Sequence, residues 1–111
     1  AREEKAREEK AREEKEEGWE GGVDVGKYVD QGWRFMDKGD AKTAADRFGQ
    51  ALAKNPRSAD AQFGVAYASE ELGKKDKAYN HYCQTLKYAG KDSDNYREAK
   101  GRLDAMGRTC K

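Results

Sequence analysis

The chain has 111 residues, of which 41% are charged, yet its formal net charge at neutral pH is only +1. This length leaves room for one modest domain, and the balanced charge gives no support for nucleic-acid binding, which needs a clustered basic surface. No apolar run approaches the roughly 20 residues that a membrane-spanning helix requires, so we expect no membrane span.

Residues 1–17 repeat the unit Ala-Arg-Glu-Glu-Lys three times and end in two glutamates. Every residue of the unit is a good helix former, and pairs such as Glu3–Arg7 lie four apart in the favourable order. A period of five rotates the alanines around a helix of about 3.6 residues per turn, so they form no apolar stripe. We expect a charged single helix that acts as an arm or spacer, and its native or engineered origin stays open.

Residues 18–24 contain three glycines, and we expect a hinge there. From Val25 onward apolar residues recur at helical spacing, and glycine or proline interrupts them at regular intervals. These interruptions predict helices over residues 25–37, 41–54, 59–71, 75–89 and 93–106. The connections are short, so successive helices should be antiparallel neighbours.

A shift of 34 residues superimposes similar side chains along this helical part. The matched pairs are Gly32 with Ala66, Gly39 with Gly73, Ala44 with Ala78, Phe48 with Tyr82 and Leu52 with Leu86. We expect Gly32 and Ala66 to lie where a partner helix crosses closely. Gly39 and Gly73 should take the left-handed backbone conformation that glycine permits, and the row Ala44, Phe48 and Leu52 should be buried.

This pattern resembles the tetratricopeptide repeat. The family's Trp-x2-Leu-Gly-x2-Tyr, Ala-x3-Phe and Pro read here as Tyr28-x2-Gln31-Gly32-x2-Phe35, Ala44-x3-Phe48 and Pro56. The second unit is looser, with Ala78-x3-Tyr82 and with Gly90 where the proline would fall. The resemblance implies an all-α fold, a short right-handed superhelix of helical hairpins that follows the N-terminal charged single helix. The expected units are repeats over 25–58 and 59–92, a capping helix over 93–107 and a tail over 108–111.

No spacing typical of a catalytic or metal-binding site is present. The one histidine, His81, reads as a partly exposed helical residue, and we expect neither an enzyme nor a cofactor. Cys83 and Cys110 are too far apart for a CxxC motif. Two free thiols are the simpler interpretation, and a Cys83–Cys110 bridge in an oxidising compartment stays open.

The resemblance also implies a concave groove, formed by the first helix of each pair, in which the family holds peptides or extended segments of partners. The expected groove residues are Val29, Trp33, Met36, Asp37, Asp60, Phe63, Tyr67, Glu70 and Arg97, with Asp94 and Asp104 beside them. Packing within the repeats does not require Trp33, Phe63 or Tyr67, and aromatic side chains are common anchors in protein recognition. The alternative is that these rings fill the interior.

Acidic residues around the rings predict a protein or peptide partner that has an apolar anchor flanked by basic residues. The sequence therefore favours a protein–protein interaction module, an adaptor or scaffold. The alternative is a structural self-assembly module that stacks or oligomerises, with the charged helix as its spacer. The compartment and the identity of the partner stay open, with a soluble, cytoplasmic chain preferred.

Overall fold

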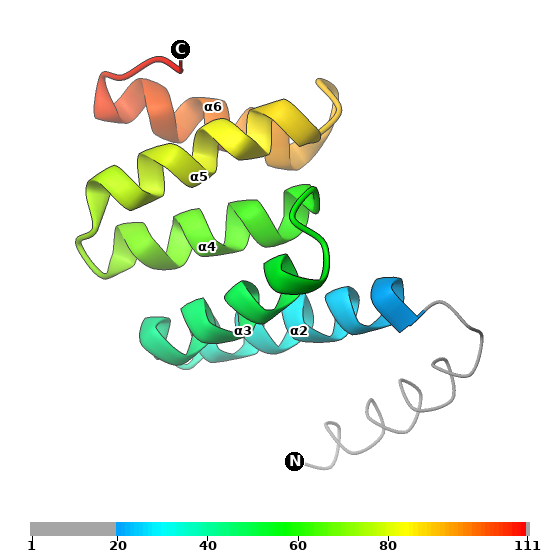
Figure 1. Ribbon diagram of the computed structural model, residues 1–111. Helices are drawn as coiled ribbons and strands as arrows, with labels where there is room; N and C mark the ends of the chain where they lie inside the picture. The colour runs from blue at the N-terminus through cyan, green and yellow to red at the C-terminus, as the bar shows by residue number, and fades with distance from the viewer. Residues whose placement is uncertain (1–19, 111) are drawn as a thin grey trace.

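The computed structural model describes residues 20–110, and side chains from Asp24 onward. These residues form five helices and no strand: α2 Glu20–Asp37, α3 Ala41–Lys54, α4 Ala59–Glu71, α5 Lys75–Tyr88 and α6 Asp94–Met106 (Figure 1). The expected arm over 1–17, the first two residues of the expected hinge and Lys111 lie outside the described residues. No helix within 20–110 has the length and apolar character needed to cross a membrane.

The helices are layered from α2 and α3 at one end, through α4, to α5 and α6 at the other end (Figure 1). Each helix packs against the next along the chain, and α4 also contacts α2 and α6. The helix α4 therefore touches every other described helix. This position explains why most of its side chains are buried, including the polar Gln62 and Ser69.

Short polar side chains begin three of the helices. The Asp40 carboxylate accepts a hydrogen bond from the Thr43 backbone N–H at 3.1 Å, and the hydroxyls of Ser58 and Ser93 accept from the N–H groups three residues on. Such caps satisfy backbone donors that lack a partner in the first turn. Gly39 and Gly73 have φ of 81° and 80°, which confirms the left-handed turns predicted at both positions.

The first described helix begins earlier than predicted. We expected the helix to start at Val25 after a glycine hinge over 18–24, whereas residues 20–24 are already helical in α2. A glycine costs a helix only about 1 kcal/mol relative to alanine, so two in succession need not break it. The extra turn also brings Asp24 within 3.4 Å of the Lys54 ammonium, which ties it to the end of α3.

Two clusters of buried side chains make up the core. The first is centred on Phe48, which is fully buried, and also contains Val25, Val29, Ala44, Ala51, Ala61, Val65 and Ala68. The second is centred on the fully buried Tyr82 and also contains Phe63, Ala66, Ala78, Ala99 and Leu103. Trp33 packs against both clusters. The buried rows predicted from the 34-residue shift are therefore confirmed, although Leu52 and Leu86 are only partly buried.

Gly32 lies where the sequence placed a close helix crossing. A Cβ atom at this position would lie 2.5 Å from the Phe48 ring, and a Cβ at Gly64 would also overlap that ring. The Phe48 side chain of α3 is thus seated between glycines of α2 and α4. Only glycine leaves this volume to the ring, so the crossing depends on both residues.

The two cysteines are bonded to each other, which corrects the interpretation as free thiols. Gly107 follows α6 with φ of 72° and reverses the chain direction. The reversal brings the residues after it back to α5, with the Cα atoms of Cys83 and Cys110 5.6 Å apart. A left-handed glycine at the end of a helix is a common stop signal. Here the turn at Gly107 is what brings Cys110 next to Cys83.

Candidate functional site

Three aromatic side chains predicted for the groove lie together. Trp33 of α2 lies with its ring centroid 6.0 Å from that of Phe63 and 5.7 Å from that of Tyr67, both on α4. Phe63 and Tyr67 stack with their ring planes 18° apart. Trp33 also meets Phe48 edge to face at 5.0 Å, so its ring reaches from the core to the surface.

A polar network adjoins these rings. The Tyr82 hydroxyl donates a hydrogen bond to the Glu70 carboxylate at 2.7 Å, and Arg102 of α6 pairs with the same carboxylate at 3.3 Å. The Arg102 guanidinium lies over the Tyr67 ring, 4.8 Å from its centroid. Burial, and then the bond to Glu70, raise the pKa of Tyr82 well above its ordinary value, so this hydroxyl stays protonated and donates.

We call Trp33, Phe63, Tyr67, Glu70 and Arg102 the ring face. Phe63 is only 8% exposed, whereas the other four side chains are each partly exposed. The ring face therefore has one buried ring, that of Phe63. Its partly exposed groups are two further rings, a carboxylate and a guanidinium. It spans the first helix of each pair, since α2 contacts α4 and α4 contacts α6.

Other predicted groove residues are placed differently. Val29 is 9% exposed and belongs to the first core cluster, against which Met36 also packs. Asp37 is exposed at the end of α2, one turn after Trp33. Asp60 is exposed at the start of α4, where its carboxylate accepts a hydrogen bond from the Asn95 side-chain amide of α6. Of this group, only the two aspartates are exposed.

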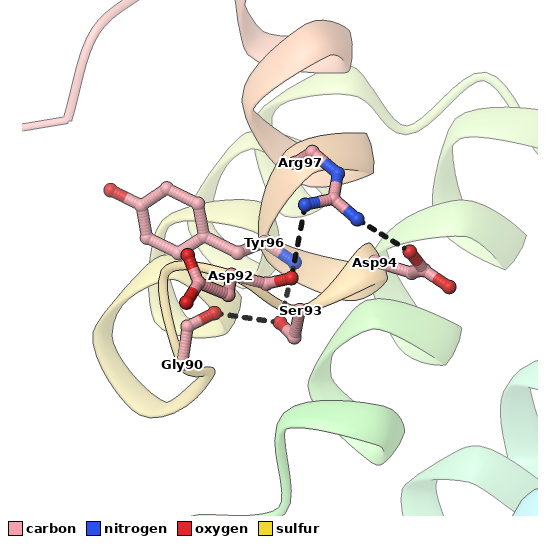
Figure 2. Close-up of polar contacts among 6 residues, drawn as sticks. All are labelled: Gly90, Asp92, Ser93, Asp94, Tyr96 and Arg97. Atoms are coloured by element: carbon pink, nitrogen blue, oxygen red, sulfur yellow. Dashed lines mark hydrogen bonds and ion pairs between the residues drawn. The ribbon is translucent and has the colours of Figure 1, made fainter.

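Arg97 is held at the start of its own helix. Its guanidinium donates to the Asp92 carbonyl at 3.0 Å and to the Asp94 carboxylate at 2.8 Å (Figure 2). The Ser93 hydroxyl in the same turn donates to the Gly90 carbonyl at 2.7 Å. Arg97 and Asp94 are thus paired with each other and are not part of the ring face.

Charge is divided between the helices of each pair. The first helix α4 carries Asp60, Glu70 and Glu71 and no lysine or arginine, and in α2 the acidic residues outnumber Lys27 and Arg34. The second helices are basic, with Lys42, Arg47 and Lys54 in α3 and Lys75, Lys77 and Lys87 in α5. The surface that α2 and α4 form around the ring face is therefore acidic.

Sequence reasoning missed Arg102. The 34-residue shift aligns Tyr67 with Gly101, and Arg102 is one of several charged residues in the last helix. Its reach across to α4 depends on a long side chain and on how α6 packs. No local sequence signal marks such a contact.

A depression of about 650 Å³ lies elsewhere, over α5 and the end of the chain. Its lining consists of Tyr79, Asn80, His81, Cys83, Gln84, Leu86, Lys87 and Cys110. None of the predicted groove residues lines it. His81, at its edge, bonds through Nδ1 to the Gln62 side-chain oxygen at 2.7 Å. Among the described residues no group of histidine, cysteine or carboxylate side chains is arranged to hold a metal ion.

Helical hairpins stacked in series, with aromatic rings in contact between successive first helices, define a helical-repeat protein. The tetratricopeptide repeat family model matches residues 29–95, and the chain therefore belongs to the tetratricopeptide repeat family. Repeats of this family generally mediate protein–protein interaction and are typically non-catalytic. Neither the curated proteins nor the solved structures gave a match to the chain.

Proposed function

We propose that the chain is an adaptor or scaffold module that binds a peptide or an extended segment of a partner protein on the ring face. The observation that carries this proposal is the Trp33–Tyr67 contact, in which two partly exposed rings from successive repeats lie 5.7 Å apart. Aromatic side chains at such positions supply large, rigid contact area for recognition. An apolar side chain of the partner would pack against the exposed parts of these two rings, which already touch each other.

The acidic surface around the ring face supports a partner with basic residues beside its apolar anchor. Asp37 and Asp60 are exposed, and α4 carries no basic residue. Complementary charge of this kind orients a partner and speeds its association more than it raises the final affinity. Arg102 limits which groups of the ring face a partner can contact, because its guanidinium already pairs with the Glu70 carboxylate and covers one face of the Tyr67 ring.

A titration of the isotope-labelled full chain, followed by amide chemical shifts, tests the proposal. The probe is a peptide with a central leucine flanked by lysine and arginine, and its control is the same peptide with glutamates in place of the basic residues. We expect shifts in α2 and α4 around Trp33 and Tyr67, and weaker binding of the control. Shifts confined to α3 and α5 would assign binding to another surface.

Two exposed aspartates give a matched pair of variants. Asp37→Lys on α2 should weaken the basic peptide by about 2- to 5-fold, the scale of one exposed ion pair, and Asp46→Lys on α3 should leave it unchanged. Tyr67→Ala should cost about 10-fold or more if the ring is an anchor. Trp33 is less suitable for truncation because it packs against both core clusters. Equal effects of the two aspartate variants would remove the proposed site.

Self-assembly is the competing function, and sedimentation across a wide concentration range separates the two. The outward side of α6 exposes Glu98, Lys100, Gly101 and Asp104. Such a polar surface does not favour close stacking of another helix on α6. A concentration-dependent oligomer that forms without peptide would favour assembly over the adaptor role.

A further inference from the structure

The described residues of the tail, Arg108–Cys110, return along α5 after Gly107. The Tyr79 hydroxyl donates to the Thr109 carbonyl at 2.8 Å, and the Arg108 guanidinium lies 3.7 Å from the Tyr79 ring centroid. Arg108 also pairs with Asp76 at 3.0 Å, a contact that is largely exposed. The Cys83–Cys110 disulfide is the one covalent link that holds the tail against α5.

This disulfide is open to attack from solvent. Cys110 is exposed and Cys83 is half-buried, and both line the depression of about 650 Å³ over α5. That volume lies in the range of about 300–1,000 Å³ typical of small-molecule sites. Lys87 lines the same depression and stands one helical turn after Cys83, with its ammonium 5.4 Å from the Tyr88 ring centroid. It therefore adds positive charge beside the depression.

We propose that the Cys83–Cys110 disulfide is a thiol-exchange site, at which a small anionic thiol forms a mixed disulfide with Cys110. The incoming thiolate bonds to the Cys110 sulfur, the bond between the two cysteines breaks, and Cys83 leaves as a thiolate that takes a proton from water. Exposure of Cys110 favours attack there, and a nearby lysine favours Cys83 as the leaving thiolate. A second thiol would release Cys110 and produce the oxidised form of the small thiol.

The exchange would act on more than the tail. The disulfide joins residues 27 apart and thereby closes a loop that contains all of α6. The helix α6 carries Arg102, which lies over Tyr67 and pairs with Glu70. Loss of the covalent link leaves α6 attached by the buried Ala99 and Leu103, by Met106, by the hydrogen bond from Asn95 to Asp60 and by the contacts of Arg102. Exchange at the disulfide would therefore loosen one side of the ring face.

The pairing bears on location as well. Disulfides persist in oxidising compartments and are rare in the cytoplasm. The Cys83–Cys110 bond therefore favours an oxidising location for the folded chain over the cytoplasm. Exchange with a small thiol would then report entry of the chain into reducing surroundings.

Incubation of the full chain with reduced glutathione, followed by intact mass and peptide mapping, tests the site. We expect one glutathione adduct, on Cys110. Lys87→Gln should slow its formation by about 2- to 5-fold through the loss of local attraction, and Lys91→Gln, an exposed lysine outside the depression, should leave the rate unchanged. Two free thiols in air-oxidised protein, an adduct on Cys83, or equal effects of the two lysine variants would each overturn the proposal.

Amide hydrogen exchange tests the coupling to α6. Reduced and alkylated protein should lose protection in α6 by about 10-fold relative to the disulfide form, because local opening follows the loss of constraint. The helix α3, which lies outside the closed loop, serves as the internal control. Unchanged protection in α6 would overturn the link between exchange and the ring face while leaving adduct formation to the mass measurement.

Discussion

The Cβ of any side chain at position 32 would lie 2.5 Å from the ring of Phe48. Phe48 is fully buried and cannot turn away, because Gly64 of α4 approaches the same ring. This relationship between Gly32 and Phe48 sets how closely α2 and α3 approach. The effect of this contact on stability can be measured against a control in the same helix, because a Cβ at Gly26 would have no heavy atom within 4 Å.

Gly32→Ala should lower the free energy of unfolding by about 1–3 kcal/mol, the usual cost of overpacking a filled core. Gly26→Ala in the same helix has no heavy atom within 4 Å of the added carbon and should instead stabilise by about 0.5–1 kcal/mol through helix propensity. Urea denaturation of both variants checks the difference. The proposed crossing would be refuted by two variants that stabilise alike.

Gly73→Ala should destabilise the chain by about 1–2 kcal/mol, because φ at this position is 80° and an L side chain is strained there. Gly73→Asn should cost less, since asparagine tolerates left-handed backbone better than alanine. Open space surrounds the position, so crowding does not contribute. Thermal unfolding of the two variants measures the order, and alanine equal to or better than asparagine would contradict it.

The Glu70 carboxylate is expected to stabilise the second repeat through Tyr82. Tyr82→Phe removes the hydroxyl that donates to it at 2.7 Å and should cost about 1–2 kcal/mol. Glu70→Ala leaves the Tyr82 hydroxyl without its acceptor and should cost about 2–3 kcal/mol. The double variant, measured by denaturation, should lose less than the sum of the single variants.

Tyr96→Phe is the matched control for this pair, because Tyr96 is a partly exposed tyrosine on α6 (Figure 2). Its substitution should change stability by less than about 0.5 kcal/mol. Strict additivity of Tyr82→Phe and Glu70→Ala would show that the two side chains act separately.

Stability should depend on pH through His81, the single histidine of the chain. Burial, and next the charge of Lys77, lower the pKa of His81 below its ordinary value of 6.5. The unfolded chain then binds a proton more readily than the folded one, so stability is full above pH 6.5 and is lost as pH falls through the folded pKa. Melting temperatures from pH 8 downward should show this fall, and His81→Gln should abolish it in that window.

The physical cause lies in the contacts of the ring. The Gln62 amide nitrogen donates to the Pro56 carbonyl at 2.9 Å, which turns its oxygen toward His81 Nδ1. The neutral His81 ring already donates its Nδ1 hydrogen to Gln62. Protonation of the ring therefore places a charge in a partly buried site, and this cost lowers the pKa. A melting temperature that rises between pH 6.5 and 5.5 would contradict this arrangement.

Much of the fold followed from the pattern of residues. The matches of Gly39 with Gly73 and of Phe48 with Tyr82 predicted two hairpins with left-handed turns and buried ring rows, and each is present. Helix ends were predicted to within a residue or two from α3 onward. The start of α2 was wrong, because glycine weakens a helix without forbidding it.

The residues predicted for the groove fall into two groups in the structure. Trp33, Phe63 and Tyr67 came together, whereas Val29 joined the core and Arg97 folded onto the start of its own helix. Sequence spacing assigns a residue to one side of a helix. It does not say whether that side faces a neighbouring helix or the solvent.

The sequence by itself determined the repeat, because helical periodicity, glycine turns and small residues 34 positions apart are local properties of the chain. Only the tertiary structure decided that Arg102 lies over Tyr67 and that Cys110 meets Cys83. Both contacts join segments distant along the chain, through a long side chain in one case and a reversal at Gly107 in the other. Such contacts depend on how whole helices pack, which no single window of sequence contains.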